Sequence, residues 1–307
     1  MHLQCRPLSY ANLSQSSTWS LHPWTLDSPQ VELHTSLLRL GIIVPPLVMG
    51  TDNNTFTIVS GYRRIQFAKA QCNSTHIDCR IMQKDLEPQL VFEIILEDIK
   101  DTSTLTLAEK AMFLSIASNY FPKETLAQKF FKRLGIKRKQ SFLDDLFHLL
   151  DGDQIFIDLA HGGLIEEQML AELLRLKNTD KYAVIDLFSQ LNLGASKQKK
   201  LLGLLRDAAY KEVFSISDYL QQDGIQTITE NETLNIPQII QHLDRYLQLK
   251  IYPQSIAAEK EFTTRIKEIT LHKNQKISHS PAFEKDTVTL STEFASLEQC
   301  IAFLQNN

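Results

Sequence analysis

The hydrophobic pattern of this chain changes near residue 104 and again near residue 250, and these changes restrict the folds open to it. Before residue 104, alternating apolar stretches such as 55–59 are separated by short helical segments and by turns rich in Gly, Pro and Asn. After it, apolar residues recur at helical spacing as far as residue 250. The sequence therefore predicts an α+β domain, then a mostly α-helical domain, with a short α+β element at the C-terminal end.

The pattern also predicts where these parts begin and end. Residues 1–30 are expected to form an irregular lead-in that could hold one short strand, and 31–103 the α+β domain. Residues 104–250 form the helical domain and 251–307 the C-terminal element. Within the α+β domain we expect helices over 33–40, 62–70 and 90–97, and strands over 55–59 and 77–82. Thr106, with Glu109 three residues later, is a capping box that starts the helical domain.

Composition narrows the classes of function. The net charge of −4 gives no overall signature of a nucleic-acid-binding protein, so contact with a polyanion would need a local basic patch. The cysteines at positions 5, 72, 79 and 300 lack the spacing of a zinc or redox site. No apolar run reaches the length of a membrane-spanning helix, and no leader is visible at the N-terminus. We therefore predict a cytoplasmic protein that does not interact with membranes.

One short motif carries most of the chemical information. The strand predicted at 55–59 stops at Ser60 and Gly61, and Arg63 and Arg64 follow in the first turn of a helix. Glycine lets the backbone approach an anion closely, and the free N–H groups of a helix N-terminus favour negative charge. Guanidinium groups match phosphate oxygens. The motif therefore predicts phosphate binding at Ser60, Gly61, Arg63 and Arg64, although two early arginines are more often a solvated helix face.

Several segments follow one another in a fixed order: 33–41, 45–48 (PPLV), 61–68 (GYRRIQFA), 97–101 (EDIKD) and the helix start at 105–111. This order resembles the ParB family, with its ParB/sulfiredoxin-like N-terminal domain and a following helical domain. This resemblance covers residues 31–176 and implies an α+β fold that binds CTP, and it could imply CTPase activity. It also implies a role in plasmid or chromosome partition or a related DNA transaction.

The resemblance further implies a Mg²⁺ ion held by Glu97 and Asp98, because a hard cation bridges carboxylate and phosphate oxygens. Three positions depart from the family pattern: Tyr62 replaces a glutamate, Asp98 an asparagine and Asp101 an arginine. These changes leave nucleotide hydrolysis open. They also leave two other classes open, namely a ParB-fold phosphotransferase or nuclease-like enzyme using Glu97 and Asp98, and an interaction module that has lost its ligand.

A basic cluster in the helical region predicts DNA binding. Residues 123–150 resemble a helix-turn-helix, with a first helix over 123–134, a turn at 135–137 and a second helix over 138–150. Two features oppose this interpretation, since Asp144 and Asp145 would face a phosphate backbone and Phe131 is bulky for a helix crossing. The resemblance also implies a homodimer, a partition ATPase partner and association with the nucleoid. The residues expected to contact DNA are Lys132, Arg133, Lys137, Arg138, Lys139, Gln140 and Ser141.

Overall fold

The computed structural model describes residues 3–15, 19–21, 31–51, 54–71, 74–99, 102, 105–272, 274–280, 283 and 285–305. The chain divides into two compact units, residues 1–181 and 182–307, and each is described by itself. The first unit holds a mixed sheet followed by helices, and the second holds helices and a two-stranded sheet. The predicted α+β class is confirmed, and the predicted domain boundaries stay predictions.

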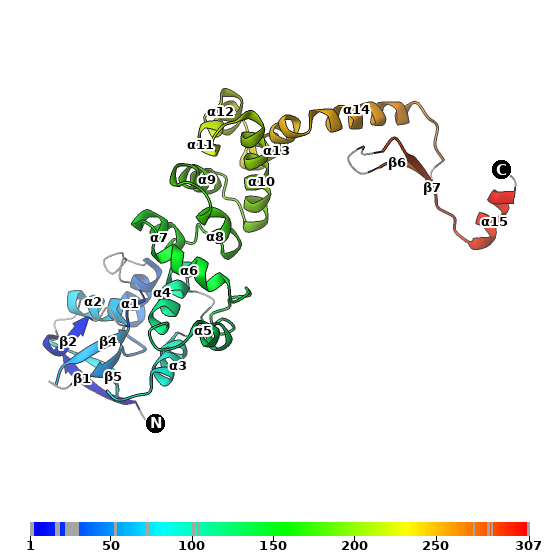
Figure 1. The fold of residues 1–307 in the computed structure, drawn as a ribbon. Helices are drawn as coiled ribbons and strands as arrows, with labels where there is room; N and C mark the ends of the chain where they lie inside the picture. Colours follow the sequence, from blue (N-terminus) through cyan, green and yellow to red (C-terminus); the bar gives the residue numbers. More distant parts are fainter. Residues whose placement is uncertain are drawn as a thin grey trace. The chain divides into compact units, whose positions relative to one another are not determined.

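The sheet of the first unit has five strands in the order β1-β5-β3-β4-β2. Strand β3 is parallel to β5 and antiparallel to β4, while β1 is antiparallel to β5 and β2 is parallel to β4. The helices α1 and α2 lie side by side next to this sheet (Figure 1). The bounds are β1 Gln4–Ser9, β2 Leu13–Gln15, α1 Val31–Leu40, β3 Leu47–Gly50, β4 Phe56–Ser60, α2 Tyr62–Gln71, β5 His76–Met82 and α3 Pro88–Asp98.

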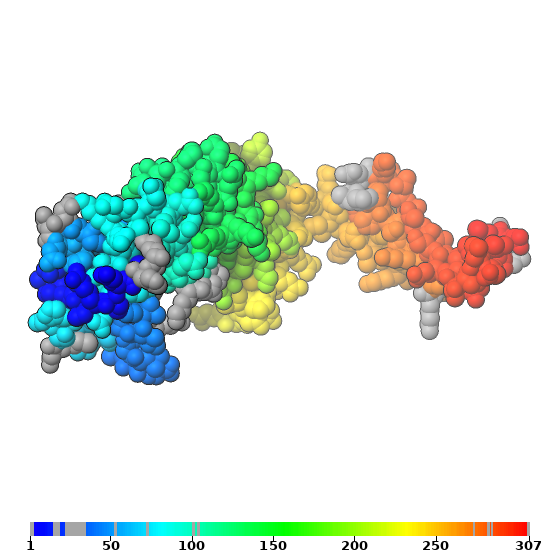
Figure 2. Space-filling view, turned by 90° about the horizontal axis from the view of Figure 1, so that it is seen from below, coloured from blue at the N-terminus to red at the C-terminus, as the bar shows by residue number. Residues whose placement is uncertain are grey.

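The lead-in contributes more structure than its sequence predicts, because it supplies both edge strands of the sheet. Strand β1 is mostly exposed, and its residues, dark blue in Figure 2, lie at the surface of the first unit. Pro7 cannot donate a backbone hydrogen bond, which suits an edge position. An edge strand with so little burial shows no alternation of apolar and polar residues, so periodicity could not reveal it.

Two apolar clusters hold the first unit together. Beneath the sheet, Val48 and Cys79 are fully buried against Ile65 and Ala68 of α2. On α3, Phe92 lies within an aromatic group. Its ring centroid is 5.5 Å from Trp19, 5.3 Å from Phe113 and 5.9 Å from Phe130. This group joins α3 to the helices that follow.

In the first unit, α4 (Leu107–Ala117) contacts α5, α6 and α7. Burial on nearly every side explains why apolar residues lie on all sides of α4 and do not form one stripe. The predicted capping box is confirmed, since the Thr106 hydroxyl accepts from the Glu109 N–H and the Glu109 carboxylate accepts from the Thr106 N–H. The other helices are α5 Lys123–Phe130, α6 Phe142–Leu150, α7 Gln154–His161 and α8 Glu167–Leu174, and α9 Asn178–Gln190 begins here and continues into the second unit.

The second unit consists mainly of helices, and α10 packs against α13. The C-terminal element, which the sequence predicts to be α+β, contains the strand β7, and β7 pairs with an antiparallel strand, β6. None of the described helices in either unit is long and apolar enough to cross a membrane. The bounds are α10 Ala195–Glu212, α11 Ile216–Leu220, α12 Asp223–Thr229, α13 Ile236–Ile251, α14 Pro253–Lys267, β6 Gln275–His279, β7 Val288–Thr292 and α15 Leu297–Gln305.

Candidate functional site

The turn between β4 and α2 is built around Gly61. Its φ angle is +92°, a conformation that L side chains rarely adopt. A Cβ atom at this position would also lie 2.9 Å from Nε and Nη2 of Arg64. The sequence predicts that an anion approaches the backbone at Gly61, but in this structure the guanidinium group of Arg64, on α2, occupies that position.

Three side chains converge on one carboxylate, that of Asp98 at the end of α3. The Ser60 hydroxyl donates to Asp98 Oδ2 at 2.5 Å, and Arg64 Nη2 lies 3.3 Å from the same oxygen. Arg80 of β5 donates through Nη2 to Asp98 Oδ1. The Asp98 side chain is only 2% exposed. Both of its oxygens are thus bound by donors from three different elements.

The two arginines are anchored on their other side by the loop before β3. Arg64 Nη1 donates to the Val44 carbonyl at 2.5 Å, and Arg80 Nε donates to the Pro45 carbonyl at 3.0 Å. Charge-assisted bonds of this kind are stronger than neutral ones. The arginines therefore tie the α2 turn, β5 and the loop together around Asp98.

Burial and charge act in opposite directions on these groups. Burial alone would raise the pKa of Asp98, but hydrogen bonds from Arg80 and Ser60 and the charges of Arg80 and Arg64 hold this pKa below its ordinary value. Burial lowers the pKa of Arg64, and Asp98 opposes that shift. Asp98 is therefore an ionised partner of the arginines at neutral pH.

Arg63 and Arg64 do not act on the same partner. Burial lowers the pKa of Arg63, while the negative charge of Glu109 opposes that effect. Glu109 belongs to the capping box of α4, whereas Asp98 ends α3. The two adjacent arginines thus interact with carboxylates from different helices, and the structure does not present them as a matched pair.

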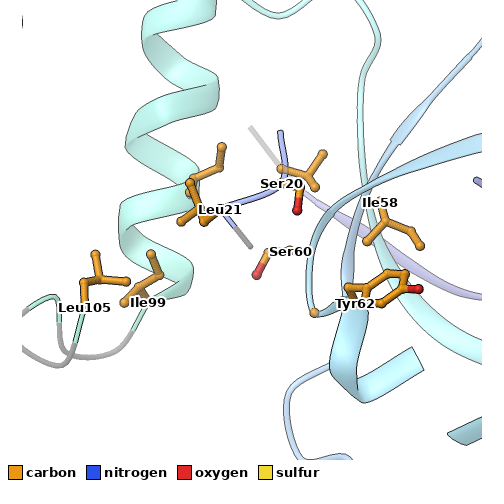
Figure 3. Close-up of a pocket in the computed structure, with 10 residues that line it drawn as sticks. Ser20, Leu21, Ile58, Ser60, Tyr62, Ile99 and Leu105 are labelled. Atoms are coloured by element: carbon orange, nitrogen blue, oxygen red, sulfur yellow. The ribbon is translucent and has the colours of Figure 1, made fainter. Parts of the chain in front are cut away.

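A small cavity of about 100 Å³ lies beside the motif. Ser60, Gly61 and Tyr62 form one part of its wall, and Ile99 and Leu105 form another (Figure 3). Pockets that hold whole ligands usually enclose several hundred Å³. The cavity could take a phosphate group, but not a complete nucleotide, without movement of its walls.

The two carboxylates predicted to share Mg²⁺ have separate partners. The Glu97 side chain is 77% exposed and pairs with Arg133 Nη2 at 2.5 Å, whereas Asp98 is buried among Ser60, Arg64 and Arg80. The described residues contain no group of three His, Cys, Asp or Glu side chains able to hold a metal ion. In this arrangement Asp98 does not fit a metal site, because a cation would have to replace both of its arginines. Magnesium at Glu97 and Asp98 stays a prediction.

The predicted helix-turn-helix region has shorter regular helices than expected. Helix α5 ends at Phe130, but helical hydrogen bonding continues to a Schellman cap, in which Ile136 N–H donates to Phe131 O at 2.9 Å and Gly135 N–H to Lys132 O at 3.3 Å. Gly135 takes the positive φ angle of +69° that such a cap requires. The glycine turn predicted at 135–137 is therefore present.

The second helix of this region starts later than predicted. Helix α6 begins at Phe142 rather than at residue 138. The preceding residues form a tighter turn, in which Phe142 and Leu143 N–H donate three residues back, to Lys139 and Gln140 O. Arg138, Gln140 and Ser141 thus lie before the helix instead of in its first turn. Phe131 is buried, although it also contributes to the lining of the groove described below.

We call residues 131–141 the basic turn. Its predicted DNA contacts separate into two groups. Arg133 is paired with Glu97, and its carbonyl accepts from the Thr102 hydroxyl. The remaining six are exposed, and four of them line a groove of about 510 Å³ together with Gly135 and Ile136. The six exposed residues are Lys132, Lys137, Arg138, Lys139, Gln140 and Ser141.

Contacts with neighbouring residues pair one acid near the basic turn and position Arg138. Lys123 of α5 pairs with Asp144 of α6 at 2.5 Å, which offsets one of the two acids near the turn. Arg138 lies over the ring of Phe142, 5.4 Å from its centroid, and Nη2 donates to the Glu167 carbonyl at 3.4 Å. These contacts hold Arg138 in place while leaving its side chain at the surface.

Arg80 is the site residue that sequence reasoning missed. It lies within the strand predicted at 77–82, outside every motif. The sequence contained one signal, namely an arginine within a strand that is predicted to be partly buried. A buried charge needs a partner. Nothing local indicates that the partner is Asp98, which lies 18 residues further on.

No protein-family model and no curated protein sequence matches the chain. Among the solved structures that match the chain, two are of C-terminally truncated chromosome-partitioning protein ParB from Caulobacter crescentus. The one complexed to the centromeric parS site is 17% identical, covers 64% of this chain and 97% of that chain, and gives a TM-score of 0.34. The one complexed with CTP-gamma-S is 18% identical, covers 60% and 97%, and gives 0.24. Both TM-scores are too low for the functions of these structures to be transferred to this chain.

Proposed function

We propose that this protein binds duplex DNA through the basic turn. The observation that supports this proposal best is the groove of about 510 Å³ lined by Lys132, Lys137 and Arg138. Three exposed cations around one concave surface suit a row of phosphates, and phosphate contacts supply most of the affinity of proteins for DNA. The overall charge of −4 does not oppose this, because a local patch determines phosphate contact.

Polar residues beside the cations could add sequence preference. Gln140 lines the same groove, and Ser141 is exposed just before α6. Glutamine and serine side chains can hydrogen-bond to base edges. Plasmid or chromosome partition, or a related DNA transaction, is the setting that the resemblance to ParB suggests. A homodimer, a partition ATPase partner and a cytoplasmic, nucleoid-associated location are parts of the same proposal.

The test is a fluorescence-anisotropy titration of the full chain with labelled duplex DNA at several salt concentrations. We expect affinity to fall steeply with salt, because each phosphate contact contributes a slope of about 0.9 in log K against log salt. Replacing Lys137 and Arg138 together by alanine should weaken binding and reduce that slope by about 2.

The matched control is Lys197→Ala combined with Lys199→Ala, which removes two exposed charges from α10 in the second unit. This variant should bind DNA like the wild type. The proposal fails if the wild type shows no salt-dependent binding, or if the control loses as much affinity as the variant of the basic turn.

A second candidate function is nucleotide binding at the start of α2, with CTP and Mg²⁺ as the ligands that the resemblance suggests. The cavity beside Ser60, Gly61 and Tyr62 favours it, because it brings a helix N-terminus to a space of phosphate size. Hydrolysis of CTP, other ParB-fold enzyme chemistry and a ligand-free interaction module are the alternatives.

Calorimetry with CTP and Mg²⁺ tests this second function. A heat of binding to the wild type is expected, and it should vanish in Arg64→Ala, whose fold is checked by circular dichroism. Chromatography of the nucleotide after incubation then separates binding from CTPase activity. Absence of heat in the wild type would exclude CTP binding and favour the interaction module.

A further inference from the structure

The donors around Asp98 have the composition of an oxyanion-binding site. Two guanidinium groups and one hydroxyl come from α2, β5 and the end of β4, and all of them bind the same carboxylate. The carbonyls of Val44 and Pro45 fix the two guanidinium groups from behind. Such a set of positioned donors would bind a carboxylate or a phosphate from another molecule in the same way.

We infer that Ser60, Arg64 and Arg80 form an oxyanion site whose resident ligand is the chain's own Asp98. The ligand class is a small anion that presents two oxygens on one side, such as a carboxylate or a phosphate group. The arginine side chains remain 17% and 23% exposed, so solvent reaches the edge of the site while Asp98 is buried.

The geometry explains why the site needs a resident anion. Arg64 packs against Gly61 so closely that no side chain fits between them, and it cannot be moved aside without breaking its bond to Val44. Two guanidinium groups held near one another repel unless an anion lies between them. Asp98 supplies that anion. Its removal would leave two positioned guanidinium groups around the space that the carboxylate had filled.

This inference bears on the nucleotide binding proposed above. A phosphate that binds Arg64 must compete with Asp98, and a competitor tethered in the same chain acts at a high effective concentration. Asp98 would then set a threshold for anion binding at the motif. Glu97 cannot replace it, since that side chain points to Arg133.

The experiment measures thermal unfolding of Asp98→Ala in sodium formate, in sodium phosphate and in sodium chloride at equal ionic strength and pH 7. We expect the midpoint to rise by about 3 °C or more in formate or phosphate relative to chloride, because a ligand that binds only the folded state stabilises it. Formate fills the space of the missing carboxylate, and phosphate tests the larger oxyanion. The wild type should show only the general stabilisation that phosphate, an excluded salt, gives to folded proteins, and this rise should be well below that of the variant.

The matched control is Asp144→Ala, which removes the exposed partner of Lys123 in the same unit. It should respond to the three salts as the wild type does. If Asp98→Ala does not fold in chloride, recovery of its folded state in formate or phosphate, and not in chloride, is followed by circular dichroism instead. An equal response of the Asp98 variant to formate, phosphate and chloride overturns the inference, and so does a rise in the wild type as large as that in the variant. Rescue by formate with no heat of CTP binding would keep the inference and exclude the nucleotide.

Discussion

Asp98→Ala is expected to lower the free energy of unfolding of the first unit by about 3–5 kcal/mol in a chloride buffer, the usual cost of removing one partner from a buried ion pair. Arg64 and Arg80 would lose the carboxylate that both of them bind, and Ser60 would lose its acceptor. Urea denaturation followed by circular dichroism measures the change. The slope of the transition should stay constant if only the native state is affected.

Asp144→Ala provides the comparison for this loss. Its partner is Lys123, and both side chains are more than half exposed, so the pair should contribute at most about 1 kcal/mol. If the two aspartate variants lose similar amounts of stability, Asp98 does not hold the turn, β5 and the loop together.

The same carboxylate should make stability depend on pH. The pKa of Asp98 is lowered in the folded state, so its contribution is fully present above the ordinary carboxyl pKa of about 3.9 and is lost as the pH falls below that value. The wild type should therefore lose more stability than Asp98→Ala on going from pH 6 to acid. Parallel curves for the two proteins would contradict this.

Phe92→Ala should have a comparably large effect, about 3–5 kcal/mol, because it leaves a cavity in the aromatic group that joins α3 to α4 and α5. Phe92 is 1% exposed and meets Trp19, Phe113 and Phe130 edge-on or tilted. Urea denaturation again gives the free energy. Trp19 fluorescence should shift toward longer wavelength if the ring becomes hydrated.

Tyr120→Ala is the control for the aromatic group. Tyr120 stacks on Trp19 with centroids 5.9 Å apart, but 41% of the residue is exposed, so its removal leaves no closed cavity. A loss well below that of Phe92→Ala is expected. Equal losses would contradict the argument that the closed cavity left by Phe92→Ala causes its large effect.

Local patterns in the sequence were sufficient to predict much of the first unit. The alternation at 55–59, the glycine after Ser60 and the apolar spacing over 62–70 predicted β4, the turn and α2, and all three are present. Thr106 and Glu109 predicted the start of α4 for the same reason. Caps, turns and helix faces depend on residues within a few positions of one another.

The partners of the charged residues could not be predicted in this way. Arg63 and Arg64 were predicted to bind phosphate together, and the resemblance to the ParB family assigned Glu97 and Asp98 to one Mg²⁺ ion. In the structure, successive residues on a helix point in different directions, so Glu97 pairs with Arg133 while Asp98 pairs with Arg64 and Arg80. The lead-in was expected to hold at most one short strand, but it holds both β1 and β2, because pairing with β5 and β4 defines these strands rather than their own pattern.

The sequence by itself thus determined β4, α2 and the start of α4, the glycine turn after β4 and most of the exposed cations of the basic turn. Only the tertiary structure decided what those groups contact. Asp98 reaches Ser60 across 38 positions of the chain and Arg64 across 34. Contacts over such sequence separations depend on how β4, α2 and α3 pack against one another. Hydrophobic periodicity within a short window contains no information about that packing.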